Sequence, residues 1–119
     1  MDLTMGALET RFADIIWDNE PLSSSELIRQ SEKLLCWKKS TSFTVLRRLC
    51  AKGIFQNQNG IVTSLISREE FFAAQSQRFV EETFQGSLPA FLAAFTSHKA
   101  LSAEEVAQLR RLVAEYEGE

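Results

Sequence analysis

The stretch from Trp37 to Gly53 holds the residues best suited to binding a polyanion. Read as a helix, it presents one face that is short-chained, hydroxyl-bearing and basic, and that contains no acid. Small residues let the backbone come close to a duplex, while arginines can reach phosphates or guanine edges. The candidate DNA-contacting residues are Lys38, Lys39, Ser40, Thr41, Thr44, Arg47 and Arg48.

The position of each candidate along this helix suggests its role. Residues 38–41 lie where the helix would enter a groove, and backbone amides and polar side chains there suit phosphate. Thr44 and Arg48 are about one turn apart and are candidates for base edges, whereas Arg47 suits phosphate. The alternative is a solvated face without a ligand. Lys52 fits that alternative, because a lysine offsets the negative end of a helix.

Residues for catalysis or metal binding are scarce. His98 is the only histidine, and neither Cys36 nor Cys50 has a CxxC neighbour or an evident base. We therefore expect no zinc site, no disulfide framework, no cofactor and no nucleophilic catalysis. The two cysteines are expected to be reduced. Of the function classes considered, an enzyme has the least support.

The charge is unevenly distributed along the chain. The net charge of −3 argues mildly against nucleic acid. Residues 33–68, however, contain seven lysines and arginines and no aspartate or glutamate, whereas acids dominate from Glu69 onward. This asymmetry favours a DNA-reading part joined to an assembly part. The alternative is clustering by chance.

Three helices should position the basic face. The first runs from Thr4 to Asp18 and the second from a Ser23–Glu26 capping box to about Lys33. The third is the basic stretch itself, which stops at Gly53. Their inward residues are expected to be Leu8, Phe12, Ile15 and Ile16, then Leu27, Ile28 and Leu34, then Phe43, Leu46, Leu49 and Cys50.

A change of period after Gly53 predicts two strands. Residues 54–58 and 61–65 flank Asn59-Gly60, the pair that a type I′ hairpin turn requires. Three helices followed by a hairpin is the order of a winged helix-turn-helix, in which the third helix enters the major groove. We therefore expect a mainly α fold with a small β-hairpin, and a winged-helix DNA-binding domain over residues 1–66.

Residues 67–119 are expected to form a helical dimerisation domain. Helices should run from Ser67 to about Phe84, from Leu88 to Phe95, and from Ser102 to about Tyr116. Such short apolar helices bury little surface alone, so a second copy should cover them; folding back onto the winged helix is the alternative. The expected dimerisation residues are Phe72, Phe79, Leu88, Phe91, Leu92, Phe95, Val106, Leu109, Val113 and Tyr116.

Motifs spread over nearly the whole chain resemble a known family. They are IIWDNEPLSSSELI, Trp37 with Thr41, the L-x-R-L-x-x-K-G run from Leu46 to Gly53, SREEF from Ser67, GSL at Gly86, and LS-x-EE-x-x-x-L-R-x-L from Leu101. In this order they resemble the BlaI/MecI/CopY family of bacterial repressors, the penicillinase-repressor type.

The resemblance implies a homodimer that binds a palindromic operator and represses transcription. It also implies a membrane sensor-protease, or a partner it activates, that cleaves the dimerisation region between Asn and Phe. The matching position is Ala94-Phe95, which keeps the phenylalanine only. The C-terminus lacks the cysteines of copper-responsive members, and residues 56–60 of the wing lack charge.

Two further expectations concern location and a competing function. No stretch is apolar enough to span a membrane and no targeting segment precedes the first helix, so we expect a cytoplasmic protein. The acidic balance and uncharged wing also fit a winged helix that binds another protein without specific DNA binding. That alternative predicts no salt-dependent binding to duplex DNA.

Overall fold

The structure, a computed structural model, describes residues 3–118. The chain divides into two compact units, the first ending at Gln77 and the second beginning at Arg78. The division falls inside one helix, later than the expected boundary after residue 66. The two units are described separately.

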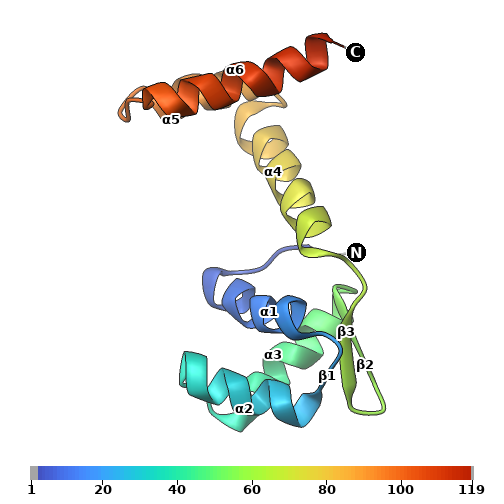
Figure 1. Ribbon diagram of the computed structural model, residues 1–119. Helices are drawn as coiled ribbons and strands as arrows, with labels where there is room; N and C mark the ends of the chain where they lie inside the picture. The colour runs from blue at the N-terminus through green and yellow to red at the C-terminus, as the bar shows by residue number, and fades with distance from the viewer. Residues whose placement is uncertain (1–2, 119) are drawn as a thin grey trace. The chain divides into compact units, whose positions relative to one another are not determined.

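The first unit is a winged helix-turn-helix. Three helices lie together and strands flank them at one edge, as Figure 1 shows. Mainly helical structure with a small sheet agrees with the expected fold class. The elements are α1 (Ala7–Asn19), β1 (Leu22–Ser23), α2 (Ser24–Leu35), α3 (Lys39–Ala51), β2 (Phe55–Gln58), β3 (Ile61–Ser64) and the first turns of α4 (Arg68–Phe84).

The sheet has three antiparallel strands in the order β1-β3-β2, one more than the expected hairpin. The added strand pairs Leu22 with Val62. A strand of two residues is too short to show an alternating pattern, so β1 leaves no local signal in the sequence. The expected turn is confirmed, since Asn59 and Gly60 have φ values of 54° and 81°. Both values are positive, as a type I′ turn requires.

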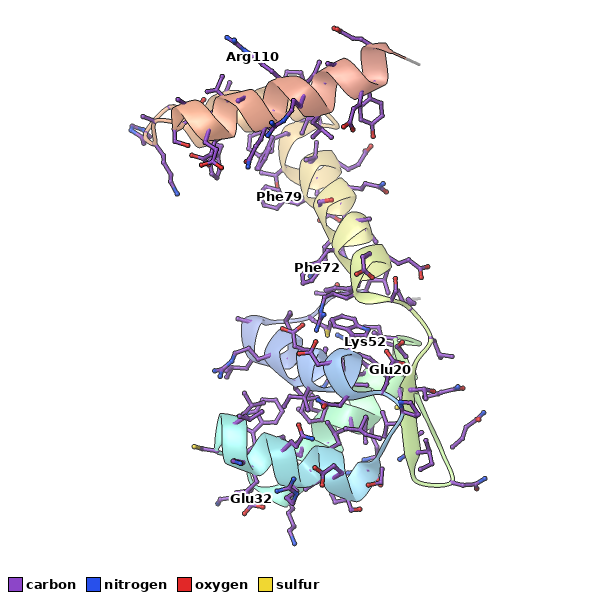
Figure 2. The ribbon with its side chains drawn as sticks, viewed as in Figure 1. Glu20, Glu32, Lys52, Phe72, Phe79 and Arg110 are labelled. Atoms are coloured by element: carbon purple, nitrogen blue, oxygen red, sulfur yellow. The ribbon has the colours of Figure 1, made fainter. Side chains whose placement is uncertain are left out.

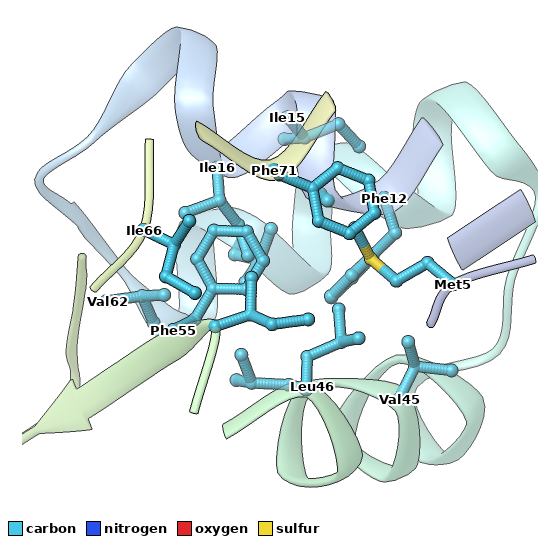
Figure 3. Close-up of a cluster of buried hydrophobic side chains, with 14 of the residues drawn as sticks. Met5, Phe12, Ile15, Ile16, Val45, Leu46, Phe55, Val62, Ile66 and Phe71 are labelled. Atoms are coloured by element: carbon cyan, nitrogen blue, oxygen red, sulfur yellow. The ribbon is translucent and has the colours of Figure 1, made fainter. Parts of the chain in front are cut away.

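A single apolar core holds the first unit together. Figure 3 shows labelled side chains from α1, α3, both wing strands and α4 converging on it, and Leu27 of α2 belongs to the same core. Phe12, Ile16, Leu49 and Phe55 are almost completely buried, and so is Phe71, which lies beyond the expected boundary. Because Phe71 is part of this core, the start of α4 belongs to the first unit.

Three residues expected to face inward do not. Leu8 and Leu34 are each 55% exposed, and Phe43 is 43% exposed. Leu8 lies in the first turn of α1, before its buried stripe begins at Phe12. On α2 it is Leu35, not Leu34, that packs against the core. On α3 the buried residues are Ser42, Val45, Leu46 and Leu49, which rotates the buried face away from Phe43.

Small polar caps define several helix ends. Ser67 and Glu70, and likewise Ser102 and Glu105, exchange reciprocal hydrogen bonds, so both expected capping boxes are confirmed. At α2 only half of the box forms. Ser23 Oγ accepts from the Glu26 amide, while the Glu26 carboxylate instead bonds Arg29 and Gln30.

The second unit consists of the end of α4, α5 (Leu88–Thr96) and α6 (Ala103–Glu117). An aromatic cluster joins α4 to α5: Phe84 and Phe91 meet edge to face at 5.6 Å, and Phe79 lies 6.0 Å from Phe91. Figure 2 labels Phe79 on α4. No described residue after Phe71 is buried. This unit therefore has local aromatic contacts but no closed core.

Candidate nucleic-acid interface

Two sets of contacts fix α3 in place: one made by the residues just before the helix, and one made within the helix itself. Cys36 caps α2 in the left-handed conformation, at φ 59°. Trp37 then stacks on Phe12 with ring centroids 5.3 Å apart. The hydroxyls of Ser31 on α2 and Ser42 on α3 are 2.6 Å apart, and both residues are fully buried. This pair satisfies two polar groups inside the core and ties the two helices of the helix-turn-helix together.

Six of the seven candidate DNA-contacting residues lie on α3 and Lys38 is its N-cap, and all seven are exposed. The four buried residues of α3 define its inward side, so helical periodicity places Ser40, Thr44 and Arg47 at the centre of the opposite side. The Thr44 hydroxyl donates to the Ser40 carbonyl at 2.8 Å, which leaves its lone pairs free to accept. The structure thus brings Ser40, Thr44 and Arg47 together on the outward side, with the other candidates at its edges or at the start of the helix.

The two arginines of α3 have different surroundings. Among residues 3–118, Arg47 makes no ion pair, and neither do Lys38 and Lys39. Arg48 lies to one side of the face, where its Nη1 is 3.5 Å from Glu9 Oε2 on α1. That oxygen is buried without a hydrogen bond, so the contact is an ion pair and not a directed bond. Glu9 was not anticipated from the sequence, because a contact between α1 and α3 leaves no local signal.

Lys52, at the end of α3, contacts the segment before α1. Its ammonium donates to the backbone carbonyl of Thr4, so it joins α3 to the segment before α1. Gly53 follows in the left-handed conformation at φ 83°, as the stop signal predicted. Lys52 therefore has a structural contact that the sequence did not indicate.

The wing is anchored at its base and uncharged at its tip. The Glu20 carboxylate, labelled in Figure 2, accepts from both the amide and the hydroxyl of Ser64 at 2.8 Å. Toward the tip, Gln56 Nε2 donates to Thr63 at 3.1 Å, and Asn57, Gln58 and Asn59 are exposed. The wing can offer amide donors to phosphate, but no charge.

Arg68, counted among the basic residues, is neutralised by α1. Its guanidinium lies 3.1 Å from Asp14, 2.6 Å from Asp18 and 5.5 Å over the Trp17 ring. The hydrogen bond with Asp18 is the largest cause that raises the pKa of Arg68. Trp17 also donates to the Ile66 carbonyl at 3.0 Å. These contacts fix the start of α4 on the first unit and remove one charge from the basic segment.

The expected dimerisation residues remain accessible in the single chain. Val113 is 56% exposed, Tyr116 is more exposed still, and Phe79, Leu88 and Phe95 are about half exposed. The remaining α5 and α6 residues of the set, Phe91, Leu92, Val106 and Leu109, are partly covered. Along α6, Leu101, Val106, Leu109 and Val113 line an open apolar groove. Phe72, at the end of the first unit, is also exposed, although its ring lies 5.5 Å from Phe71.

The remaining candidates are placed as follows. Ala94 and Phe95, the residues matching the cleavage position, lie exposed within α5. Cys36 is exposed, and burial raises the pKa of the Cys50 thiol. Among residues 3–118 there is no cluster of three or more potential metal ligands of the His, Cys, Asp or Glu type. In that same part of the chain, none of the helices combines the length and apolarity needed to cross a membrane.

This geometry defines a winged helix-turn-helix protein that presents a basic helix. Comparison with known proteins identifies its family. Residues 5–115 match the family described as penicillinase repressor. The penicillinase repressor of Bacillus licheniformis is 24% identical over 112 residues, which cover 91% of this chain and 88% of that protein. The methicillin resistance regulatory protein MecI of Staphylococcus aureus (strain Mu50 / ATCC 700699) is 24% identical, with 92% of each chain covered.

The chain belongs to the penicillinase repressor family. Its relatives are named as repressors and regulatory proteins, not as enzymes, in agreement with the expectation from the sequence. Among solved structures, the reduced and oxidized forms of MarR from E. coli match with a TM-score of 0.46. Their identities are 23% and 24%, and the matches cover 96% of this chain and 75% and 76% of MarR. The family match, not this structural likeness, identifies the chain.

Proposed function

We propose that this chain represses transcription by binding a palindromic DNA operator as a homodimer in the cytoplasm, with α3 in the major groove. The observation that carries the proposal is the outward face of α3. It carries exposed hydroxyls beside three cations, Lys38, Lys39 and Arg47, that make no ion pair among residues 3–118. Buried contacts hold this helix in place. Family membership supports the same function.

Within this proposal, the positions on α3 favour distinct roles. Lys38, Lys39, Ser40 and Thr41 lie at the start of the helix, where amides and side chains hold phosphate. Thr44 and Arg48 were predicted to read base edges. Arg48 would have to leave Glu9, whose Oε2 is buried, so the loss of this ion pair offsets part of the roughly 1–3 kcal/mol that a bidentate contact with guanine contributes. Arg47 reaches the duplex without breaking a contact.

The homodimer is proposed from the second unit. Several of its large apolar side chains are about half exposed, although it has no buried core. A second copy that covers them would remove apolar surface from water and bring two α3 helices to one duplex. A monomer that leaves these side chains in water is the competing state.

The experiment compares single arginine variants in duplex-binding titrations at several salt concentrations. Arg47→Ala and Arg48→Ala should each weaken binding and reduce its dependence on salt, because fewer counterions are released. Arg11→Ala is the matched control, since it removes the same charge from the side of α1 that carries Asp14 and Asp18 and faces Arg68. Unchanged affinity and salt slope in both α3 variants would reject the proposed face.

The same titration separates the competing functions. A winged helix that binds only another protein would show no salt-dependent affinity for duplex DNA. Relief of repression by cleavage at Ala94–Phe95, by a membrane sensor-protease or its partner, stays a prediction. The bond lies in helix α5, so a protease would first have to unwind that helix.

A further inference from the structure

We propose that Phe43 determines operator specificity by packing against thymine methyl groups in the major groove. This inference rests on the proposed function, because it needs α3 to enter DNA. It starts from a disagreement with the sequence pattern, which placed Phe43 in the core. The structure buries Ser42 in its stead and leaves Phe43 43% exposed.

The neighbours of Phe43 place it on the outward face. Lys39 and Ser40 lie one turn before it, Arg47 lies one turn after it, and all three are exposed. By helical periodicity, Phe43 and Arg48 flank the centre of the face on opposite sides. Arg48 is on the side that meets Glu9 of α1, so Phe43 lies on the side away from that contact.

Phe43 has no partner ring in its own chain. Among residues 3–118, the aromatic contacts join Phe12 to Trp37, Trp17 to its neighbours, and the phenylalanines of α4 and α5 to each other; none includes Phe43. No lysine or arginine of this part of the chain lies over its ring either. A single exposed apolar residue is ordinary on a protein surface, so its place between cations is the informative feature.

The chemistry of the major groove supplies a ligand for this ring. Thymine is the base that presents a methyl group there, and phenylalanine is among the side chains that contact it. Cations around the ring would hold phosphates while the ring reads an apolar base edge, so affinity and specificity come from adjacent residues. Cytosine offers an amino donor at this edge, which a phenyl ring cannot satisfy.

The test removes the methyl group alone. Duplexes are first selected by the wild-type protein from a random-sequence library at fixed salt, and each thymine is then replaced by deoxyuridine. For at least one position in each half-site, wild-type affinity should fall about fourfold, the factor expected for removing one buried methyl group. Phe43→Ala should bind the thymine duplex more weakly and should show no further loss with deoxyuridine at that position.

Leu8→Ala is the matched control, because Leu8 is a comparably exposed apolar residue on α1. It should keep the wild-type response to deoxyuridine. Circular dichroism and thermal unfolding of Phe43→Ala should match the wild type, so misfolding would be detected. Sedimentation should show the wild-type mass; a changed mass together with a retained deoxyuridine response would make Phe43 a protein contact and overturn the inference.

The remaining outcomes distinguish this inference from the proposed function. Salt-dependent binding without any sensitive thymine, or with equal sensitivity in Phe43→Ala, overturns the role of Phe43 and leaves DNA binding intact. Failure of the wild type to select or bind any duplex overturns both.

Discussion

The first unit buries its large apolar residues within one chain, whereas the second leaves them accessible. All the buried apolar residues of the described chain lie between Met5 and Phe71. After Phe71 no described residue is buried, although α5 is rich in leucine, alanine and phenylalanine. The difference supports the proposal that a second copy covers the second unit, whereas the first unit buries its core within one chain.

The two units also differ in the kind of side chain that they expose. In the first unit, buried side chains fix α3 while its cations point outward. In the second, Ser102 caps the N-terminus of α6, but the apolar stripe of this helix is only partly covered. An exposed basic helix in one unit and exposed apolar side chains in the other support the proposal that two copies bind one duplex.

Disrupting the second unit should have the largest effect. Val113→Asp places a carboxylate on the exposed apolar stripe of α6, so the dimer should dissociate. Affinity for a two-site duplex should then fall by about 100-fold or more, because avidity is lost. Gel filtration and duplex titration measure the two effects. Gln108→Asp, on the opposite side of α6, is the control, and a monomer with unchanged affinity would contradict the account.

Removing a side chain from the first core should reduce stability next most strongly. Phe71→Ala should cost about 3–5 kcal/mol, because it leaves a cavity among fully buried neighbours. Phe72→Ala, one residue away and exposed, should cost much less. Urea unfolding followed by tryptophan fluorescence measures the free energy of unfolding, since the ring centroids of Trp17 and Phe71 are 5.6 Å apart. Equal costs for the two variants would mean that α4 does not belong to the first unit.

The buried serine pair should show a smaller, coupled effect. Ser31→Ala should cost about 1–3 kcal/mol by leaving the buried Ser42 hydroxyl without its partner, whereas Ser42→Ala should cost less because the Ser31 hydroxyl still donates to the Ile28 carbonyl. The double variant Ser31→Ala with Ser42→Ala should cost less than the sum of the single variants, because both polar groups are then absent. Ser40→Ala, exposed on the same helix, serves as the control. Additive costs in thermal unfolding would show that the two hydroxyls do not interact.

The smallest expected effect concerns pH. The hydrogen bond from Arg29 is the main cause that lowers the pKa of Glu26 from 4.5 to about 2. A lowered folded-state pKa stabilises the fold above pH 4.5, and this contribution is lost as pH falls toward 2. Glu26→Gln should therefore flatten the acid side of the stability curve slightly. An NMR titration that finds Glu26 at its ordinary pKa would remove the basis for this expectation.

Local patterns predicted the elements better than the contacts between them. The Asn59-Gly60 turn, the Gly53 stop and two capping boxes were predicted because each depends on residues close in sequence. β1, the Glu9–Arg48 ion pair and the Asp14 and Asp18 contacts of Arg68 join residues far apart, so no local signal exists for them. Phe43 was misplaced because hydrophobic spacing could not reveal that Ser42 would be buried against Ser31.

The central claim, that two chains held by their second units present two α3 helices to one duplex, is tested most directly by sedimentation equilibrium. The protein is measured alone and bound to a labelled duplex selected from random sequence. We predict twice the single-chain mass of 13.5 kDa in the free state, and two chains for each duplex in the complex. A free mass of one chain, with one chain bound to each duplex, would contradict the account.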